Sequence, residues 1–297
     1  MPQLIAQLLD YQKEAVQWCL DQEEKGGVLA YDMGLGKTVI GCAIMVQNPI
    51  KTLVMVPTGL LAQWAMEIEK HTKGLTVAIY HGPQRQSLSQ QKIMETASVI
   101  LSTPLVIARD LQKGIHFQCG RWIVDEAHRL KNSDGKAYQI LYKHAPDVPY
   151  KLFFTGTPVC NSMDDLKALL CLTERKPYNS LKYWKDRSLD NKLEEMKPLV
   201  ASFVLRRTKE EVLSQKLPSI QTTAIPLSLP NQCEQRYVYN TYLEEDDLLR
   251  RMIRLRQAAN SANVFRPNTM AELEGASVKY EALKHLLASI PLTDKVL

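Results

Sequence analysis

Features that would define several classes of protein are missing from this sequence of 297 residues. Its six cysteines form no Cys-x-x-Cys pair and have no paired histidine spacing, so neither a zinc site nor a disulfide framework is expected. No apolar run approaches the roughly 18 residues of a membrane span. The best candidate, residues 99–108, is interrupted by Ser102, Thr103 and Pro104. The N-terminus also lacks the pattern of a signal peptide. We therefore expect a soluble intracellular protein, with cytoplasm, nucleus and a viral source all left open.

Neither sign of charge dominates the composition. The chain has 37 Lys and Arg residues against 32 Asp and Glu residues, and its 45% of hydrophobic residues exclude a disordered chain. The basic residues are densest at 206–207 and in the run of Arg250, Arg251, Arg254 and Arg256. Such clusters can meet nucleic-acid phosphates. A solvated helix face is the other interpretation, and charge alone favours it.

Short apolar runs rich in β-branched residues alternate with longer helical patterns over the first half of the chain. These runs lie at residues 27–30, 52–56, 76–80, 98–101, 121–124 and 151–154. Near-continuous apolar runs indicate strands buried on both faces, as in a parallel sheet covered by helices. Segments between them, such as residues 60–71, have apolar residues at helical spacing and can serve as crossovers. The pattern predicts a doubly wound α/β domain.

The pattern changes after residue 154. Helices are expected over residues 162–200, with breaks at Pro177 and Pro198, and the next strand is expected at 201–205. The remaining segments are a strand-like run at 222–227, a helical stretch at 231–262, a turn-rich break at 263–269, a helix at 277–289 and the beginning of a strand at 294–297. No internal repeat or low-complexity tract is present.

The most specific motif is the turn Asp-Met-Gly-Leu-Gly-Lys-Thr at residues 32–38, between a predicted strand and a predicted helix. The loop that would surround a triphosphate consists of Met33, Gly34, Leu35, Gly36, Lys37 and Thr38. Glycines leave backbone N–H groups open to phosphate oxygens, Lys37 would reach the β- and γ-phosphates, and Thr38 would ligate Mg²⁺. The strict pattern has a glycine where Tyr31 stands. The position at a strand–helix junction nevertheless favours nucleotide binding over a structural glycine turn.

A second motif, Asp-Glu-Ala-His at residues 125–128, follows another buried strand. Carboxylates at the carboxyl end of such a strand face the crevice where ligands bind in open α/β sheets. Asp125 would hold Mg²⁺ through water, and Glu126 would orient and polarise the attacking water. An isolated Asp-Glu pair is usually a solvated turn, but the preceding strand and the upstream phosphate loop favour the catalytic interpretation.

Two further polar groups are candidates for coupling the motifs. His128 is either a structural histidine or a contact between the nucleotide site and the next motif, Thr-Gly-Thr-Pro at residues 155–158. Thr155 and Thr157 can hydrogen-bond to the turn at 125–128 and transmit the state of the nucleotide. A plain proline-containing turn explains the same residues equally well.

These motifs, in this order, resemble those of superfamily-two helicase-like ATPases, and most of all the Swi/Snf (switch/sucrose non-fermenting) family of DNA translocases. The segment 8–12 is similar to the adenine-recognition segment, with Gln12 as the reading residue, and Asp-Glu-Ala-His corresponds to the DEAH box. Segments 56–64 and 101–104 resemble motifs that approach a DNA strand, which implies contacts from Thr58, Ser102 and Thr103. The sequence departs from the family pattern at Gln63, Pro104, Cys160 and the pair at 31–32.

The resemblance implies a P-loop, RecA-like α/β fold with a helical insertion, and ATP and Mg²⁺ as cofactors. Residues 1–165 would form the core of the first RecA-like lobe, 166–275 the helical insertion with return segments, and 276–297 only the start of a second lobe. A second lobe, in a longer chain or in trans, would supply arginine fingers. Arg206, Arg207 and the cluster at 250–256 match other segments and are not expected to be these fingers.

The expected function is that of the first motor lobe of an ATP hydrolase that translocates on double-stranded DNA, held mainly by contacts to the DNA backbone. A helicase that unwinds DNA or RNA, or a restriction-type translocase subunit, is the alternative within the same superfamily. An alternative of another class is a nucleotide-dependent nucleic-acid-binding module with little or no turnover. No membrane association and no zinc are expected.

Overall fold

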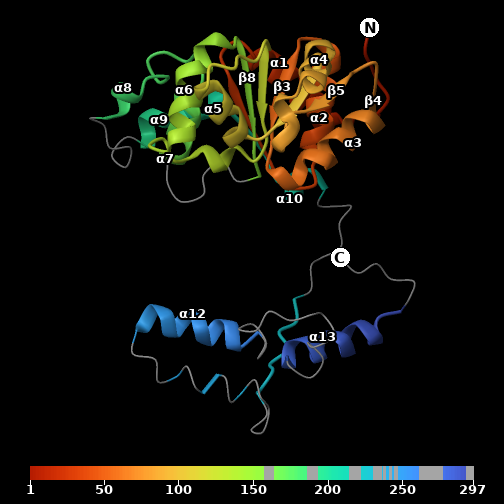
Figure 1. The fold of residues 1–297 in the computed structure, drawn as a ribbon, viewed down its shortest axis with the longest axis vertical. Coiled ribbons are helices and arrows are strands. Elements are labelled where there is room, and N and C mark those ends of the chain that lie inside the picture. Colours follow the sequence, from red (N-terminus) through yellow and green to blue (C-terminus); the bar gives the residue numbers. More distant parts are fainter. Residues whose placement is uncertain are drawn as a thin grey trace. The chain divides into compact units, whose positions relative to one another are not determined.

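The computed structural model describes residues 1–156, 164–185, 193–213, 222–229, 236, 239–240, 243, 247–260 and 277–291 (Figure 1). The chain divides into two compact units, residues 1–217 and 218–297. The predicted site residue Thr157, the predicted break at 263–269 and the predicted strand start at 294–297 lie outside the described residues. The division into residues 1–165, 166–275 and 276–297 expected from the resemblance stays a prediction.

The first unit is built on a parallel sheet in the order β5-β6-β3-β7-β8-β2-β9. Its strands are β2 Gly27–Tyr31, β3 Thr52–Met55, β5 Val77–Ile79, β6 Val99–Ser102, β7 Arg121–Val124, β8 Tyr150–Phe154 and β9 Val204–Arg207. Two short strands, β1 Gln3–Leu4 and β4 Thr72–Lys73, form a separate antiparallel pair. Because the chain order is scrambled and all neighbours are parallel, each connection must cross over the sheet, and the predicted doubly wound α/β domain is confirmed.

Helices cover both faces of this sheet (Figure 1). The α-helices of the first unit are α1 Asp10–Gln22, α2 Lys37–Gln47, α3 Leu61–His71, α4 Leu88–Thr96, α5 Pro104–Gln112, α6 Lys136–His144, α7 Asp164–Cys171, α8 Leu181–Lys185, α9 Leu193–Phe203 and α10 Lys209–Leu213. Short 3₁₀ helices are η1 Thr58–Leu60, η2 Pro83–Gln86, η3 Ala127–Leu130 and η4 Ala145–Asp147.

Side chains of β2 alternate between two hydrophobic cores. Val28 and Ala30 pack with the helices α5, α6, α7 and α9, whereas Leu29 and Tyr31 pack with α1, α2 and α3. All five residues of β2 are buried. This two-sided burial explains why the strand is a continuous apolar run, without the alternation of a strand that has one face in water.

The segment from α9 to β9 differs from the sequence prediction in two ways. Helix α9 contains Pro198, where a break was expected, and it extends to Phe203, so that β9 begins at Val204 and not at residue 201. A proline inside a helix removes one i→i−4 hydrogen bond and leaves the remaining turns able to form. Phe203 is fully buried in the core beside α5, α6 and α7, and that packing keeps the last turn helical.

The second unit contains α12 Leu248–Ala258 and α13 Val278–Ser289. Side-chain oxygens cap both helices, since Asp247 accepts a hydrogen bond from the N–H of Arg250 and Ser277 accepts one from the N–H of Tyr280. The strand predicted at 222–227 is wrong, because residues 222–229 have no regular structure. They are largely exposed, and Pro226 has no N–H to donate to a strand ladder. None of the described helices is long and apolar enough to cross a membrane.

Candidate nucleotide-binding site

Three loops that follow neighbouring strands meet at the carboxyl edge of the sheet. The strands β7, β8 and β2 are adjacent and parallel. The predicted phosphate loop follows β2, the turn at 125–128 follows β7, and Thr155 follows β8. Carboxyl ends of parallel strands are where open α/β sheets bind their ligands, and this edge is therefore the candidate site.

The phosphate loop needs glycine at its two glycine positions. Gly34 and Gly36 have φ angles of 87° and 82°, in the left-handed region that other residues rarely adopt. A Cβ on Gly36 would also clash with the Nε2 atom of Gln12. Between them, Leu35 is fully buried in the core, whereas Met33 is exposed. Any contact that Leu35 makes with a ligand must therefore come from its backbone.

Lys37 is the first residue of α2 and is only 9% exposed. Its ammonium donates to the carbonyl oxygens of Tyr31 at 2.7 Å and of Asp32 at 3.4 Å, so it closes the loop onto itself. Burial lowers the pKa of Lys37, and the nearby carboxylates of Asp125 and Glu126 partly oppose that shift. The lysine therefore lies where the phosphate loop and the two acidic residues come together. Thr38 is the next residue of α2.

Gln12 joins α1 to the phosphate loop. Its Oε1 atom accepts from the N–H of Leu9 at 3.0 Å, and its Nε2 atom donates to the carbonyl of Leu35 at 3.2 Å. The side chain is buried and both ends of its amide have protein partners. The adenine-reading role implied by the resemblance stays a prediction.

Asp125 is buried at the end of β7 and held by two donors. Its Oδ2 atom accepts from the Nε1 atom of Trp64 at 2.9 Å, and its Oδ1 atom accepts from the N–H of Glu126 at 2.9 Å. Burial raises the pKa of Asp125, against the effect of these hydrogen bonds. In the sequence, Trp64 is one of the apolar residues at helical spacing in segment 60–71, and its contact with Asp125 is not apparent there. The available signal was that a buried indole N–H needs an acceptor.

Glu126 has an unusual backbone conformation. Within the described ranges it is the only non-glycine residue with a positive φ angle, 51°. Non-glycine residues in this region are uncommon and concentrate at functional sites. Its Oε2 atom lies 3.2 Å from the Nδ1 atom of His128, which lies 3.2 Å from the hydroxyl of Thr155. The structure thus places His128 and Thr155 in contact, as the sequence suggested, while their coupling role stays a prediction.

Of the three residues predicted to contact a DNA strand, two line a cavity and one is buried. Thr58 and Thr103 line a cavity of about 320 Å³ that also contains Asp125 and Glu126. The Thr103 hydroxyl caps α5 by accepting from the N–H of Val106. Ser102 is fully buried, and its hydroxyl donates to the carbonyl of Tyr80 at 2.7 Å. Its side chain is therefore not available to a nucleic acid in this conformation.

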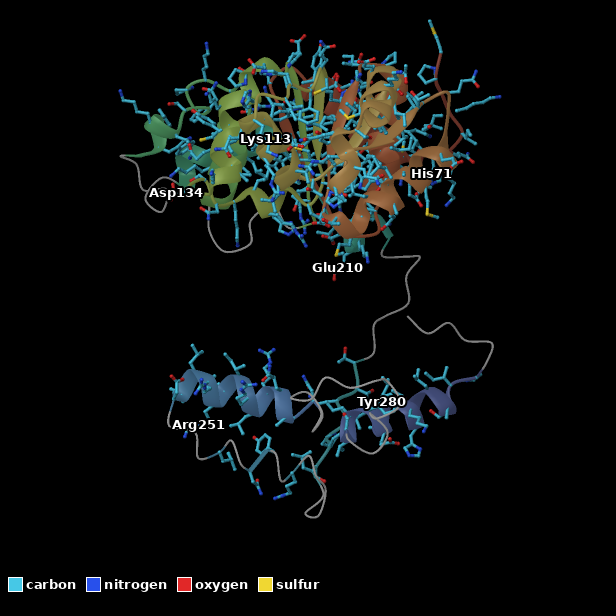
Figure 2. All side chains as sticks on the ribbon, viewed as in Figure 1. His71, Lys113, Asp134, Glu210, Arg251 and Tyr280 are labelled. Carbon is cyan, nitrogen blue, oxygen red and sulfur yellow. The ribbon has the colours of Figure 1, made fainter. Side chains whose placement is uncertain are left out.

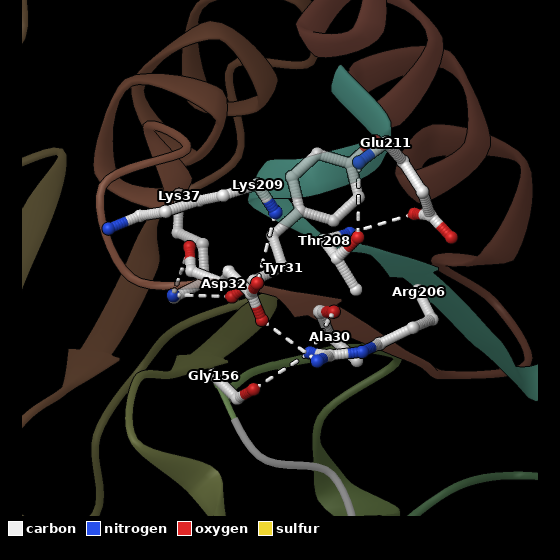
Figure 3. A network of polar contacts seen from close by, with 9 residues as sticks. All are labelled: Ala30, Tyr31, Asp32, Lys37, Gly156, Arg206, Thr208, Lys209 and Glu211. Atoms are coloured by element: carbon white, nitrogen blue, oxygen red, sulfur yellow. Dashed lines mark hydrogen bonds and ion pairs between the residues drawn. The ribbon is translucent and has the colours of Figure 1, made fainter. Parts of the chain in front are cut away.

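A network around Arg206 connects β9 to the phosphate loop (Figure 3). The guanidinium of Arg206 donates to the carbonyls of Ala30 at 3.0 Å and Gly156 at 2.8 Å, and pairs with the Asp32 carboxylate at 2.8 Å. The other oxygen of Asp32 accepts from the N–H of Lys209 at 3.0 Å. These contacts lower the pKa of Asp32. The interpretation of residues 206–207 as a solvated helix face is wrong, because they belong to an edge strand that joins the site.

An open parallel α/β sheet with a glycine-rich phosphate loop at its carboxyl edge defines the P-loop domains of RecA-like type. Within that class, residues 11–288 match the model of the SNF2-related domain, and the chain belongs to this family. The resemblance to Swi/Snf proteins is thereby confirmed.

Curated relatives include the SWI/SNF chromatin-remodeling complex subunit snf22 of Schizosaccharomyces pombe, 34% identical over 59% of this chain and 11% of that protein. The nuclear protein STH1/NPS1 of Saccharomyces cerevisiae is 30% identical over 77% of this chain and 19% of that protein. Chromodomain-helicase-DNA-binding protein 6 of Mus musculus is 29% identical over 90% of this chain and 10% of that protein. The chain thus spans only a small part of each of these relatives.

A solved structure of the Sulfolobus solfataricus SWI2/SNF2 ATPase core in complex with dsDNA has a similar fold, with a TM-score of 0.59 and 24% identity. The match covers 96% of this chain and 64% of that core. It confirms the predicted RecA-like architecture.

Proposed function

We propose that this chain is the ATP-binding motor lobe of a DNA-dependent ATPase that translocates along double-stranded DNA. The observation that carries the proposal is the convergence of Lys37, Asp125 and Glu126 beside one phosphate loop. A basic group, a metal-binding carboxylate and a carboxylate able to orient water are the parts that phosphoryl transfer to water requires. Membership in the SNF2-related family supports the same conclusion.

The residues present fit ATP and Mg²⁺. Gly34 and Gly36 have no Cβ that could block a ligand, so backbone N–H groups of the loop around them can bind phosphates, together with Lys37. The Thr38 hydroxyl and the Asp125 carboxylate are oxygen ligands of the kind that Mg²⁺ prefers, and when bound the metal neutralises charge on the phosphates. In the described part of the chain no three acidic, cysteine or histidine side chains form a metal cluster.

Glu126 would orient the attacking water and accept its proton. Its strained backbone and its contact with His128 fix the direction of the carboxylate. His128, Thr155 and Thr157 would then report the presence of the terminal phosphate to the rest of the lobe. Gln12, which donates to the carbonyl of Leu35 in the loop, would read the adenine.

DNA would lie against the carboxyl edge of the sheet, where Thr58 and Thr103 line a cavity with Glu126. Contacts to phosphates predict binding that tolerates any sequence and weakens with salt. Turnover is proposed to require a second RecA-like lobe, in a longer chain or in trans, because arginine fingers accelerate such reactions by about 10³ to 10⁵.

A test of this function is to measure ATP hydrolysis with and without duplex DNA. The 297-residue chain, a longer chain that includes a second RecA-like lobe, and that longer chain with Lys37→Ala are compared. We expect slow hydrolysis by the first, strong stimulation by DNA in the second, and no activity in the third. Failure of DNA to accelerate the longer chain would reject the translocase. Retention of DNA binding that depends on nucleotide would then support the binding module.

The hydrogen bond between Trp64 and Asp125 leads to a further prediction. Trp64→Phe keeps a buried ring but removes the donor, and the Asp125 carboxylate loses one of the two hydrogen bonds that orient it. Partners of metal-binding groups typically change metal affinity by about 10- to 100-fold when removed. We expect the Mg²⁺ concentration for half-maximal ATP hydrolysis by the longer chain to rise about tenfold.

Trp184→Phe is the matched control. Trp184 is also buried, and its Nε1 atom donates to the carbonyl of Tyr178 at 2.8 Å, away from Asp125. Both variants lose an indole hydrogen bond, so both should be somewhat less stable. Only Trp64→Phe should alter the Mg²⁺ requirement, and an equal change in the two variants would contradict the assigned role.

A further inference from the structure

A segment distant in sequence brings a second lysine to the phosphate loop. The N–H of Lys209 donates to the Asp32 carboxylate at 3.0 Å, and the N–H of Asp32 donates to the carbonyl of Arg207 at 3.1 Å. Arg206 pairs with the remaining oxygen of Asp32 at 2.8 Å. These three contacts anchor the backbone of Lys209 beside Asp32, the residue that precedes the loop, and Figure 3 shows the two that involve Lys209 and Arg206.

The side chain of Lys209 extends over the loop. Its Cε and Nζ atoms lie 3.5 and 3.7 Å from the point that a Cβ on Gly34 would occupy. Lys209 is exposed, and among the described residues its ammonium forms no ion pair within hydrogen-bonding distance, although the charge of Lys209 acts on the nearby Asp32 carboxylate. The ammonium is therefore exposed to solvent directly above a predicted phosphate-binding loop.

Lys209 also faces the residue proposed to activate water. One cavity of about 510 Å³ is lined by Asp32, Met33, Glu126, His128, Arg129, Gly156 and Lys209. It opens between the phosphate loop on one side and Glu126 on the other. A phosphate that is attacked by water held on Glu126 must lie between these two walls.

We propose that Lys209 is a second phosphate-binding cation of this site, which contacts the terminal phosphate of a bound nucleoside triphosphate. Lys37 is buried and donates to the carbonyls of Tyr31 and Asp32, so it would neutralise the phosphates from the protein side of the loop. Lys209 would approach from the opposite, solvent side, and the Asp32–Arg206 pair would position it. This inference rests on the proposed function, because it assumes that a nucleotide binds on the loop.

The test is nucleotide binding by the 297-residue chain, measured by titration calorimetry at fixed Mg²⁺. The ligands are an ATP analogue with a nitrogen bridge between the β- and γ-phosphates, and ADP. Lys209→Gln removes the charge but keeps the backbone hydrogen bond to Asp32. Charge-assisted contacts are the stronger class of hydrogen bond, so we expect the analogue to bind about tenfold more weakly. ADP affinity should change less than about twofold, because ADP lacks the group contacted.

Lys113→Gln is the control for loss of one positive charge. Lys113 is an exposed lysine of the same unit, and Figure 2 shows it well away from Glu210, the neighbour of Lys209. Wild-type affinity of Lys209→Gln for the analogue would overturn the proposal, as would equal losses for the analogue and ADP or an equal loss in Lys113→Gln. Absence of nucleotide binding by the unaltered chain, or full binding by Lys37→Ala, would instead reject the proposed function.

Discussion

Replacing Glu126 by glutamine is expected to reduce DNA-stimulated ATP hydrolysis by about 10²- to 10⁴-fold, the range typical of a general base. Glutamine has the same shape and can still hydrogen-bond to water, but it cannot accept the proton. Nucleotide affinity should stay nearly unchanged, because Lys37 and the loop are intact. The measurement is steady-state hydrolysis by the longer chain at saturating DNA, together with nucleotide titration of the 297-residue chain.

Glu24→Gln is the matched control for this variant. Glu24 is exposed and lies just before β2, at the amino end of the sheet and opposite the candidate site. It loses the same carboxylate and should hydrolyse ATP at the unaltered rate. A Glu126→Gln protein that keeps hydrolysis within tenfold of the unaltered protein would exclude Glu126 as the base.

The backbone conformation of Glu126 allows one substitution to distinguish its effect on catalysis from its effect on stability. Its φ angle of 51° suits glycine better than glutamate, and a non-glycine residue in this region typically costs about 1–3 kcal/mol. Glu126→Gly should therefore be no less stable than the unaltered protein while being inactive. Such a result would indicate that glutamate is kept at this strained position for its carboxylate and not for folding.

Local patterns were sufficient to predict the sheet and to locate the glycine-rich turn and the acidic pair at its strand ends. Six of the seven strands of the sheet lie on apolar runs that are readable without context, and the loop at 32–38 and the pair at 125–126 each follow one of them. Such motifs combine short spacing with a fixed position at a strand end, so a single sequence contains the information.

Contacts between distant segments could not be predicted in this way. The Trp64–Asp125 bond joins residues 61 apart, and the Arg206 contact with Ala30 joins residues 176 apart. Both depend on which strands are neighbours, and the pairing of β9 with β2 at the sheet edge has no local signal. The end of α9 was misplaced for a related reason, because burial of Phe203 outweighs local propensity.

A buried ion pair lies at the amino ends of the strands, away from the candidate site. Breaking it should have the largest effect on stability of all the changes predicted. Arg121, which is fully buried at the start of β7, binds the Oε1 atom of Glu23 through its Nε atom at 2.6 Å. Its other nitrogens donate to the hydroxyl of Thr52 and the carbonyl of Asn48. The second oxygen of Glu23 accepts from the side chain of Asn48 at 2.7 Å. Each nitrogen of the guanidinium and each oxygen of the carboxylate has a protein partner, and both charged side chains are almost completely buried.

Glu23→Gln is expected to lower the free energy of unfolding of the first unit by about 3 kcal/mol, because removal of one partner leaves a buried charge uncompensated. The NH₂ group of the new glutamine would also face the NH₂ group of Asn48, so that two hydrogen-bond donors would meet where a donor and an acceptor meet now. All four tryptophans lie within residues 1–217, so tryptophan fluorescence during urea unfolding reports on this unit alone.

Two comparisons decide whether the charge is the cause. Lys13→Gln breaks the exposed pair with Asp10 and should leave the urea midpoint unchanged. The double variant Glu23→Leu with Arg121→Met removes both charges together, and since apolar replacement of a buried pair is often neutral, it should be more stable than Glu23→Gln alone. The double variant could instead be less stable than Glu23→Gln. In that case the hydrogen bonds of Arg121 to Thr52 and Asn48, and not the compensation of its charge, would be what joins β7 and β3 to the end of α1.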